Sequence, residues 1–201
     1  MTSEGDAVPI MPPGERVLCR TAAWGVLVRP LVPWALSGQA LNGDVLEIGG
    51  GAGAMAAGML DRFPAARVTV ADLDPRMVRA SGRRLARFGE RARVEVGDAI
   101  ALPFADASFD VVVSCLMLHH IGRWEDAVAE AARVLRPGGR FLGYDLHDSA
   151  VSRLIHHADG IHDLRSISAP AFGQALGAAG LRDRQLRQGR LTLRWSATRR
   201  D

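Results

Sequence analysis

Residues 45–53 read Val-Leu-Glu-Ile-Gly-Gly-Gly-Ala-Gly, a short apolar run that contains Glu47 and ends in a glycine-rich turn. The next residues, 54–62, have the composition of a helix. Glycine lets backbone approach a ligand closely, and a helix that begins at such a turn presents its free amides to that ligand. The stretch therefore predicts a strand, a ligand-binding turn and a helix, which is the first unit of an α/β fold.

The alternation of strand and helix continues after this unit. Residues 67–72 are rich in β-branched side chains and predict a second strand, and Asp74 and Pro75 predict the start of a helix over 76–87. Further strands are expected at 94–96, 109–115 and 140–146, and a helix at 124–135 that ends at the Arg136-Pro137-Gly138-Gly139 turn. This order favours a parallel sheet covered on both faces by helices.

The two ends of the chain have different patterns. Residues 14–37 carry apolar side chains at helical spacing interrupted by Pro30 and Pro33, which indicates one or two entry helices. Residues 172–179 predict a helix, and the runs 181–186 and 191–198 resemble a hairpin. We expect one domain, 1–201, with these parts: an N-terminal arm and entry helices (1–37), a cofactor-binding core (44–146), a substrate lid (147–170), and a last helix with a C-terminal hairpin (171–201).

Composition supports an ordinary globular domain. The 201 residues are 48% hydrophobic and 23% charged, with a formal net charge of +3, which suits a single core. All basic residues are Arg, so the pI near 9.6 reflects a compositional bias rather than nucleic-acid binding. The start of the chain lacks a signal-peptide pattern, and residues 22–36 are too short and too interrupted to span a bilayer. We expect a cytoplasmic protein without a membrane span.

The glycine spacing alone leaves the ligand open. Gly49, Gly51 and Ala54 satisfy the dinucleotide fingerprint G-x-G-x-x-G/A, and Asp72 at the end of the second strand can hold a ribose in either case. Glu47 decides between them, because a carboxylate here repels a pyrophosphate but suits a ligand that carries an ammonium and a sulfonium. The alternative is that Glu47 is a surface or capping carboxylate.

These residues resemble the motifs of the class I S-adenosylmethionine-dependent methyltransferases of the small-molecule type. The resemblance covers four blocks in the expected order: 47–53, 70–75, 97–110 and 133–140. It implies a Rossmann-like, doubly wound, seven-stranded α/β sheet of strand order 3-2-1-4-5-7-6, with strand 7 antiparallel. The hairpin expected at the C-terminus agrees with that arrangement.

The resemblance also implies a cofactor, S-adenosyl-L-methionine, with S-adenosyl-L-homocysteine as product. Asp72 matches the ribose-binding acid, Leu73 the residue that packs on adenine, and Asp98 the acid near the adenine amino group. The full set of predicted cofactor-binding residues is Glu47, Gly49, Gly50, Gly51, Gly53, Asp72, Leu73, Met77, Gly97, Asp98, Ala99, Ser114, Cys115, Leu116 and His119.

Methyl transfer depends mainly on in-line positioning, with a base needed only when the acceptor must lose a proton. The candidate catalytic residues are His119, which follows the fourth strand, and Tyr144 and His147, which lie at the end of the fifth. For His119 a purely local hydrogen-bonding role stays equally open. We predict no metal, although His147, Asp148, His156, His157, His162 and Asp163 could converge on one ion if they are not simply a His-rich surface or lid.

We predict a methyltransferase (EC 2.1.1.-) that acts on oxygen, nitrogen or carbon of a small molecule. The entry helices could cover the site and favour an apolar acceptor, although core packing explains them more simply. A membrane-surface role is weaker, because Arg29 is nearly the only charge in that segment.

Three other functions were weighed. An RNA methyltransferase is suggested by the basic C-terminus but lacks an Asn-Pro-Pro-Tyr motif, so nucleic acid is not an expected partner. A nicotinamide oxidoreductase is disfavoured by Glu47 and by the absence of a Tyr-x-x-x-Lys pair in a chain without Lys. A non-enzymatic cofactor-binding module and a homodimer stay open, and the sequence names neither the acceptor nor the pathway.

Overall fold

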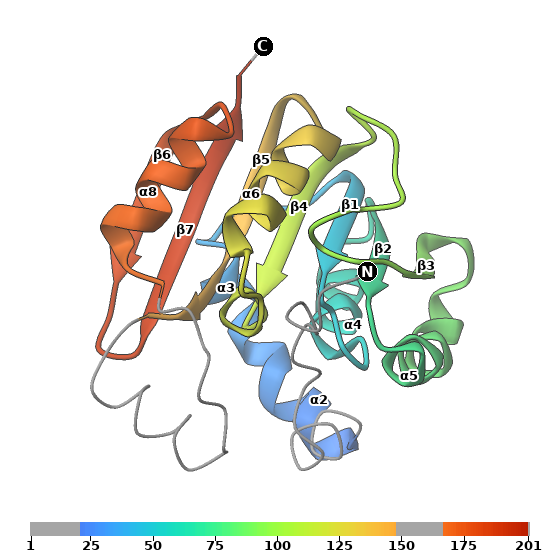
Figure 1. Cartoon of the computed structure of the whole chain (residues 1–201). Coiled ribbons are helices and arrows are strands. Elements are labelled where there is room, and N and C mark those ends of the chain that lie inside the picture. The colour runs from blue at the N-terminus through green and yellow to red at the C-terminus, as the bar shows by residue number, and fades with distance from the viewer. Residues whose placement is uncertain (1–20, 148–166, 201) are drawn as a thin grey trace, which may run out of the picture.

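A computed structural model describes residues 21–147 and 167–200 (Figure 1). The strands are β1 (Gly43–Ile48), β2 (Ala66–Asp72), β3 (Ala92–Val96), β4 (Phe109–Cys115), β5 (Leu135–Leu146), β6 (Leu181–Gln188) and β7 (Thr192–Arg199). The helices are α2 (Ala22–Val28), α3 (Val32–Ala35), α4 (Ala54–Arg62), α5 (Pro75–Leu85), α6 (Trp124–Val134) and α8 (Ala169–Ala178), with short 3-10 turns η1 (Arg29–Leu31), η2 (Ala86–Arg91) and η3 (Leu118–His120).

The strands form one seven-stranded sheet of order β3-β2-β1-β4-β5-β7-β6. Pairs among β1 to β5 are parallel, whereas β7 runs antiparallel to both β5 and β6. The predicted fold class and strand order are therefore confirmed. Because parallel strands end at the same edge, the segments that follow β1, β2, β4 and β5 meet there, which is where ligands bind in open α/β sheets.

Both faces of the sheet are buried. Along β4, Val112 belongs to the core cluster that includes α6 and α8, and its neighbours Val111 and Val113 belong to the cluster that includes α2, α3 and α4. This alternation follows from the two-residue repeat of a strand. A strand that is covered on both sides needs an unbroken apolar run, so the prediction of a central buried strand over 109–115 is confirmed.

The start of β5 was predicted wrongly. The turn expected to precede a strand at Arg140 is included in β5, because Leu135 already pairs with Phe109 and the register then shifts to pair Arg140 with Val111. The intervening residues bulge out of the ladder, and Gly138 takes a φ of +73° that favours glycine.

The prolines of the entry segment begin its helical pieces. Pro30 and Pro33 lie in the first turns of η1 and α3, where no amide donor is required. Asp74 caps α5 as predicted, because its carboxylate accepts the backbone N–H of Arg76 at 2.8 Å. Among the described helices, none is long and apolar enough to cross a membrane.

Candidate active site

The glycine turn after β1 is shaped by the segments that cross it. Gly49 has a φ of +64°, and a Cβ there would lie 1.9 Å from Met117 Cγ, in the segment after β4. A Cβ on Gly50 would lie 2.6 Å from Val70 Cγ1 and 2.9 Å from Glu47 Oε2. Only glycine fits this close approach of backbone to its neighbours.

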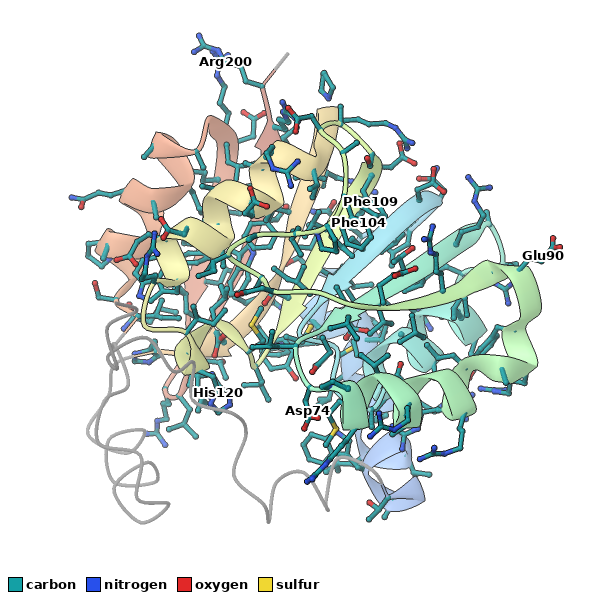
Figure 2. The ribbon with its side chains drawn as sticks, turned by 45° about the vertical axis from the view of Figure 1, so that its right-hand side comes forward. Asp74, Glu90, Phe104, Phe109, His120 and Arg200 are labelled. Atoms are coloured by element: carbon teal, nitrogen blue, oxygen red, sulfur yellow. The ribbon has the colours of Figure 1, made fainter. Side chains whose placement is uncertain are left out.

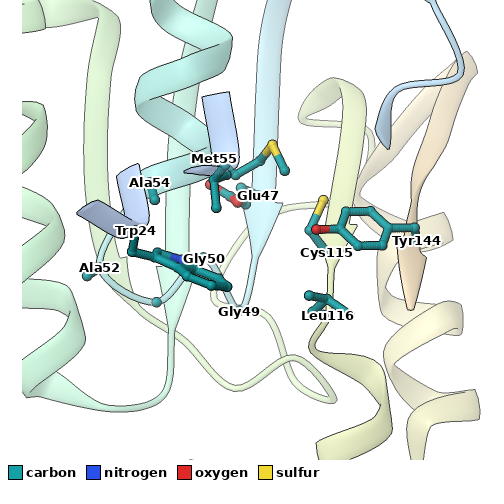
Figure 3. Close-up of a pocket in the computed structure, with 12 residues that line it drawn as sticks. Trp24, Glu47, Gly49, Gly50, Ala52, Ala54, Met55, Cys115, Leu116 and Tyr144 are labelled. Atoms are coloured by element: carbon teal, nitrogen blue, oxygen red, sulfur yellow. The ribbon is translucent and has the colours of Figure 1, made fainter. Parts of the chain in front are cut away.

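A pocket opens at this turn (Figure 3). Seven of the predicted site residues line it, namely Glu47, Gly49, Gly50, Gly51, Cys115, Leu116 and Tyr144. Sequence reasoning did not assign the others to the cofactor site: Trp24, Val28, Ala52, Ala54 and Met55. The wall made by Trp24 and Val28 comes from α2, so the entry segment contributes to the pocket directly.

Glu47 is the buried acid of this pocket. Its side chain is buried, and its Oε2 atom has no hydrogen-bond partner among the described residues. Burial, reinforced by the nearby Asp72 carboxylate, raises the pKa of Glu47 to about 8. A buried carboxyl group with one unsatisfied oxygen is a receptor for a cationic group, which fits the ammonium of the predicted cofactor.

Asp72 holds the glycine turn in place at the end of β2. Its two carboxylate oxygens accept the backbone N–H groups of Gly51, at 2.8 Å, and Asp74, at 2.9 Å. Burial raises the pKa of Asp72 above its ordinary value. Carboxylate oxygens can accept further hydrogen bonds, so a ribose-binding role is compatible with these contacts. The predicted adenine neighbour Leu73 follows directly and is partly exposed.

The third predicted block lies beside Asp72. The backbone N–H of Gly97 donates to the Asp72 carbonyl at 3.1 Å, and the Asp98 carboxylate accepts the N–H of Ile100 at 3.1 Å, which closes a tight turn around Ala99. Further along, the ring of Phe104 packs edge-on against Phe109 at 5.1 Å (Figure 2), which fixes this segment against β4.

Three predicted cofactor residues have packing roles outside the pocket. A Cβ on Gly53 would lie 2.5 Å from Ser81 Oγ, so this glycine permits the close approach of α4 to α5. Met77 is buried against Ala52 beneath the turn. Ser114 is fully buried within β4, between β1 and β5, and does not line the pocket.

His119 forms a buried pair with Asp145. The ring Nδ1 contacts Asp145 Oδ1, and the second carboxylate oxygen accepts the N–H groups of Met117 at 3.1 Å and Leu118 at 2.7 Å. Burial alone would raise the pKa of Asp145, but the charge of His119 and its hydrogen bond hold that pKa below its ordinary value. When the ring is neutral, the carboxylate favours the tautomer with the proton on Nδ1, which leaves the acceptor lone pair on Nε2.

Sequence reasoning missed this pairing, because its signal lies in the register between β4 and β5. Asp145 follows Tyr144, which pairs with Cys115 in the parallel β4–β5 register, so both partners leave neighbouring strands at the same edge. The spacing of 26 residues between His119 and Asp145 gives no hint of contact unless that register is known.

Of the other two catalytic candidates, Tyr144 lies in the pocket and His147 lies outside it. Tyr144 lines the pocket and packs edge-on against Trp34 at 4.8 Å, and burial raises the pKa of its hydroxyl. His147 does not line the pocket. Its ring Nε2 lies 3.0 Å from the Gly189 carbonyl oxygen, and its backbone N–H donates to the Leu191 carbonyl at 3.1 Å. These bonds join the end of β5 to the terminal hairpin.

The metal alternative falls mostly outside the described part of the chain. Among residues 21–147 and 167–200, no group of three or more His, Cys, Asp or Glu side chains could hold an ion. Asp148, His156, His157, His162 and Asp163 lie in the stretch that the structure does not describe, as does most of the predicted lid.

The mainly parallel sheet and the glycine turn beside the buried Glu47 are typical of proteins that bind a nucleotide-containing cofactor. Residues 46–143 match the family model described as a methyltransferase domain. A ubiquinone/menaquinone biosynthesis C-methyltransferase UbiE of Paracoccus denitrificans is 44% identical over 134 residues, 65% of this chain and 52% of that protein. A malonyl-[acyl-carrier protein] O-methyltransferase of Geobacter sulfurreducens is 41% identical over 97 residues, 48% of this chain and 36% of that protein.

Solved structures share the fold. The Bacillus subtilis YcgJ protein superposes with a TM-score of 0.72 at 22% identity, covering 88% of this chain and 99% of that one. A Haemonchus contortus phosphoethanolamine N-methyltransferase, solved with S-adenosylhomocysteine, has a TM-score of 0.73 at 15% identity, covering 86% and 52%. Residues 46–143 thus form a methyltransferase domain, whose fold is shared with S-adenosylmethionine-dependent methyltransferases of known structure, and the chain spans about half the length or less of the curated relatives named above.

Proposed function

We propose that this chain binds S-adenosylmethionine at the glycine turn and transfers its methyl group to a carbon of a small, apolar, aromatic acceptor. The observation that carries the proposal is the buried Glu47 carboxyl group, with one oxygen unsatisfied, facing a pocket made by the glycine turn. A cationic amino acid moiety satisfies this carboxyl group by favouring its ionised form, whereas a pyrophosphate-bearing cofactor brings no cation to it.

Each part of the site has a distinct task in this proposal. The cofactor supplies an electrophilic methyl group on its sulfonium. Glu47 and the amides of the glycine turn would hold the amino acid end, Asp72 and Leu73 would hold the ribose and adenine, and Asp98 would bind near the adenine amino group. The resulting rate enhancement comes chiefly from alignment of acceptor and methyl group.

The aromatic acceptor is supported by the pocket walls and by the relatives. Trp24, Leu116 and Tyr144 line the pocket, and Trp34 packs on the Tyr144 ring. Such a wall favours a flat apolar ring over a charged or strongly hydrated acceptor. Several relatives are named as C-methyltransferases of ubiquinone and menaquinone biosynthesis. Transfer to oxygen or nitrogen remains the alternative that the assay below separates.

A ring carbon becomes nucleophilic when a neighbouring hydroxyl loses its proton. We assign that step to His119, which is buried after β4 against Asp145 and does not itself line the pocket. We assign the proton-accepting atom to Nε2, because Asp145 engages Nδ1. His147 has no part in this step, since its ring bonds a backbone carbonyl of the hairpin.

Several C-terminal arginines that suggested RNA have partners within the protein. Arg184 donates to the carbonyl of Gly173, Arg194 to that of Trp34 at 2.9 Å, and Arg199 to that of Arg133 at 2.8 Å. Guanidinium groups committed to backbone carbonyls are less available to phosphates, so the RNA alternative loses much of its support.

The test is methyl transfer from labelled cofactor to a panel of acceptors: a prenylated hydroquinone, a catechol, a malonyl thioester and RNA. We expect label on a ring carbon of the hydroquinone, located by mass spectrometry, and loss of transfer in Glu47→Gln. Glu95→Gln is the matched control, because Glu95 lies on β3 and pairs with Arg93 at the surface. Label on RNA or on the thioester alone would refute the proposed acceptor.

A further inference from the structure

The entry segment carries two apolar stripes. Residues 22–35 follow one helical path through α2, η1 and α3. Val28, Val32 and Ala35 are buried, at the i, i+4, i+7 spacing of one helix face. Leu27, Leu31 and Trp34 repeat the same spacing one residue earlier and are 61%, 39% and 39% exposed. A helix that only packed on the core would need the first stripe alone.

We call the outward side chains of this segment the apolar ridge: Val26, Leu27, Leu31 and Trp34. Val26 is 70% exposed, the most of any large hydrophobic side chain among the described residues. The ridge belongs to the same segment whose Trp24 and Val28 line the cofactor pocket, and Figure 1 shows α2 at the edge where the parallel strands end. The ridge therefore borders the mouth of the site.

Basic side chains from distant elements lie beside the ridge. Arg29, Arg84 and Arg87 line one cavity together with Val26, and Asp61 is the acid that pairs with both Arg29 and Arg87. Arg29 and Arg87 share the single carboxylate of Asp61, so these three groups leave one positive charge in excess. The sequence alone showed Arg29 almost by itself, because Arg84 and Arg87 come from the region after β2.

The opposite flank is basic as well. The Arg194 guanidinium, from β7, lies 5.1 Å from the centre of the Trp34 ring. Trp34 is thus an exposed aromatic side chain with a cation over its face, next to exposed aliphatic side chains. Large apolar side chains bordered by arginine are the pattern of segments that lie in the interface of a lipid bilayer.

We propose that the apolar ridge docks this chain on the surface of an anionic lipid bilayer, with Arg29 and Arg87 contacting the headgroups. Charge favours this occupant over a second copy of the chain, because a symmetric pairing of ridges would bring two basic flanks together. The docking would also place the pocket mouth at the membrane surface, but the inference does not depend on methyl transfer and is tested without it.

The experiment is sedimentation of the full chain with vesicles of phosphatidylcholine, with and without phosphatidylglycerol, at low and high salt. We expect binding to the anionic vesicles that weakens with salt, and a loss of about tenfold or more in Leu27→Gln/Leu31→Gln. Arg87→Gln should weaken binding by about fivefold. The matched controls are Val96→Gln, another exposed apolar side chain, and Arg187→Gln on β6, and both should bind like the unaltered chain.

Every outcome decides the proposal. Failure of the unaltered chain to bind anionic vesicles, as expected if another part of the same chain covers the ridge, overturns it. Equal loss in the controls also overturns it, because binding would then be nonspecific. Sedimentation velocity without vesicles identifies a dimer, and a dimer that dissociates in Leu27→Gln/Leu31→Gln assigns the ridge to self-association instead. Melting temperatures of the variants show that each is folded.

Discussion

Replacing Glu47 by Gln should change how the stability of the protein depends on pH. Burial raises the pKa of this carboxyl group in the folded state from its ordinary 4.5 to about 8. The folded state therefore keeps a proton that the unfolded state has lost, so this contribution to stability is complete below about pH 4.5 and is lost as pH rises to about 8. The loss amounts to about 1.36 kcal/mol for each pH unit and stops near pH 8. Between pH 6 and pH 9 it therefore extends over about two units and is about 3 kcal/mol.

The Glu47→Gln side chain has nearly the same shape as the original side chain but cannot gain or lose a proton in this pH range. Urea unfolding of both proteins without cofactor, at pH 6 and pH 9, should show that the unaltered protein loses about 3 kcal/mol more than the variant over this interval. Groups remote from Glu47 titrate equally in both proteins and cancel in the comparison. Equal pH dependence in the two proteins would mean that Glu47 is not held in a buried, protonated form, and the reasoning about its burial would be refuted.

Four further substitutions test the rest of the structure. Gly143→Ala should destabilise the protein by more than about 3 kcal/mol, because its Cβ would lie 1.9 Å from the Ser114 carbonyl oxygen, whereas Gly82→Ala on the open side of α5 should stabilise it by about 0.5–1 kcal/mol in chemical unfolding. His147→Ala should cost about 1 kcal/mol of stability and leave the cofactor Kd unchanged; a large rise in Kd would return this residue to the site. Asp145→Asn should lower kcat by about 100-fold and alter its pH profile, since His119 loses the carboxylate that orients it, and a lowered melting temperature with an unchanged profile would indicate a structural role alone.

The sheet could be predicted because its signals are local. The apolar run of β4, the Asp74 cap and the alternation of strands with helices each depend on residues close in sequence, and the structure reproduces them. The start of β5 was missed because its pairing partner Phe109 is remote in sequence, and a proline-glycine turn does not reveal that it bulges from a ladder.

The site was predictable only in part, for the same reason. The glycine turn and Glu47 lie within one motif, and the structure brings them into one pocket. Gly53 belongs to the same motif, and Met77 and Ser114 lie a few residues after two others, but all three face neighbouring elements. A motif indicates which residues are near the ligand and not the direction of every side chain. The His119–Asp145 pair and the basic flank of the apolar ridge depend on contacts between distant segments, which no local pattern records.

Isothermal titration of the protein with S-adenosylmethionine at pH 7, in buffers of different ionisation enthalpy, tests the central claim most directly. Glu47 with a pKa of about 8 is mostly protonated at this pH, and a bound ammonium group favours its ionised form. We expect saturable binding with release of nearly one proton in the unaltered protein, and weaker binding without that release in Glu47→Gln. Absence of binding by a folded protein, or binding with the same proton release in both proteins, would contradict the assignment of Glu47 as the receptor for the cofactor.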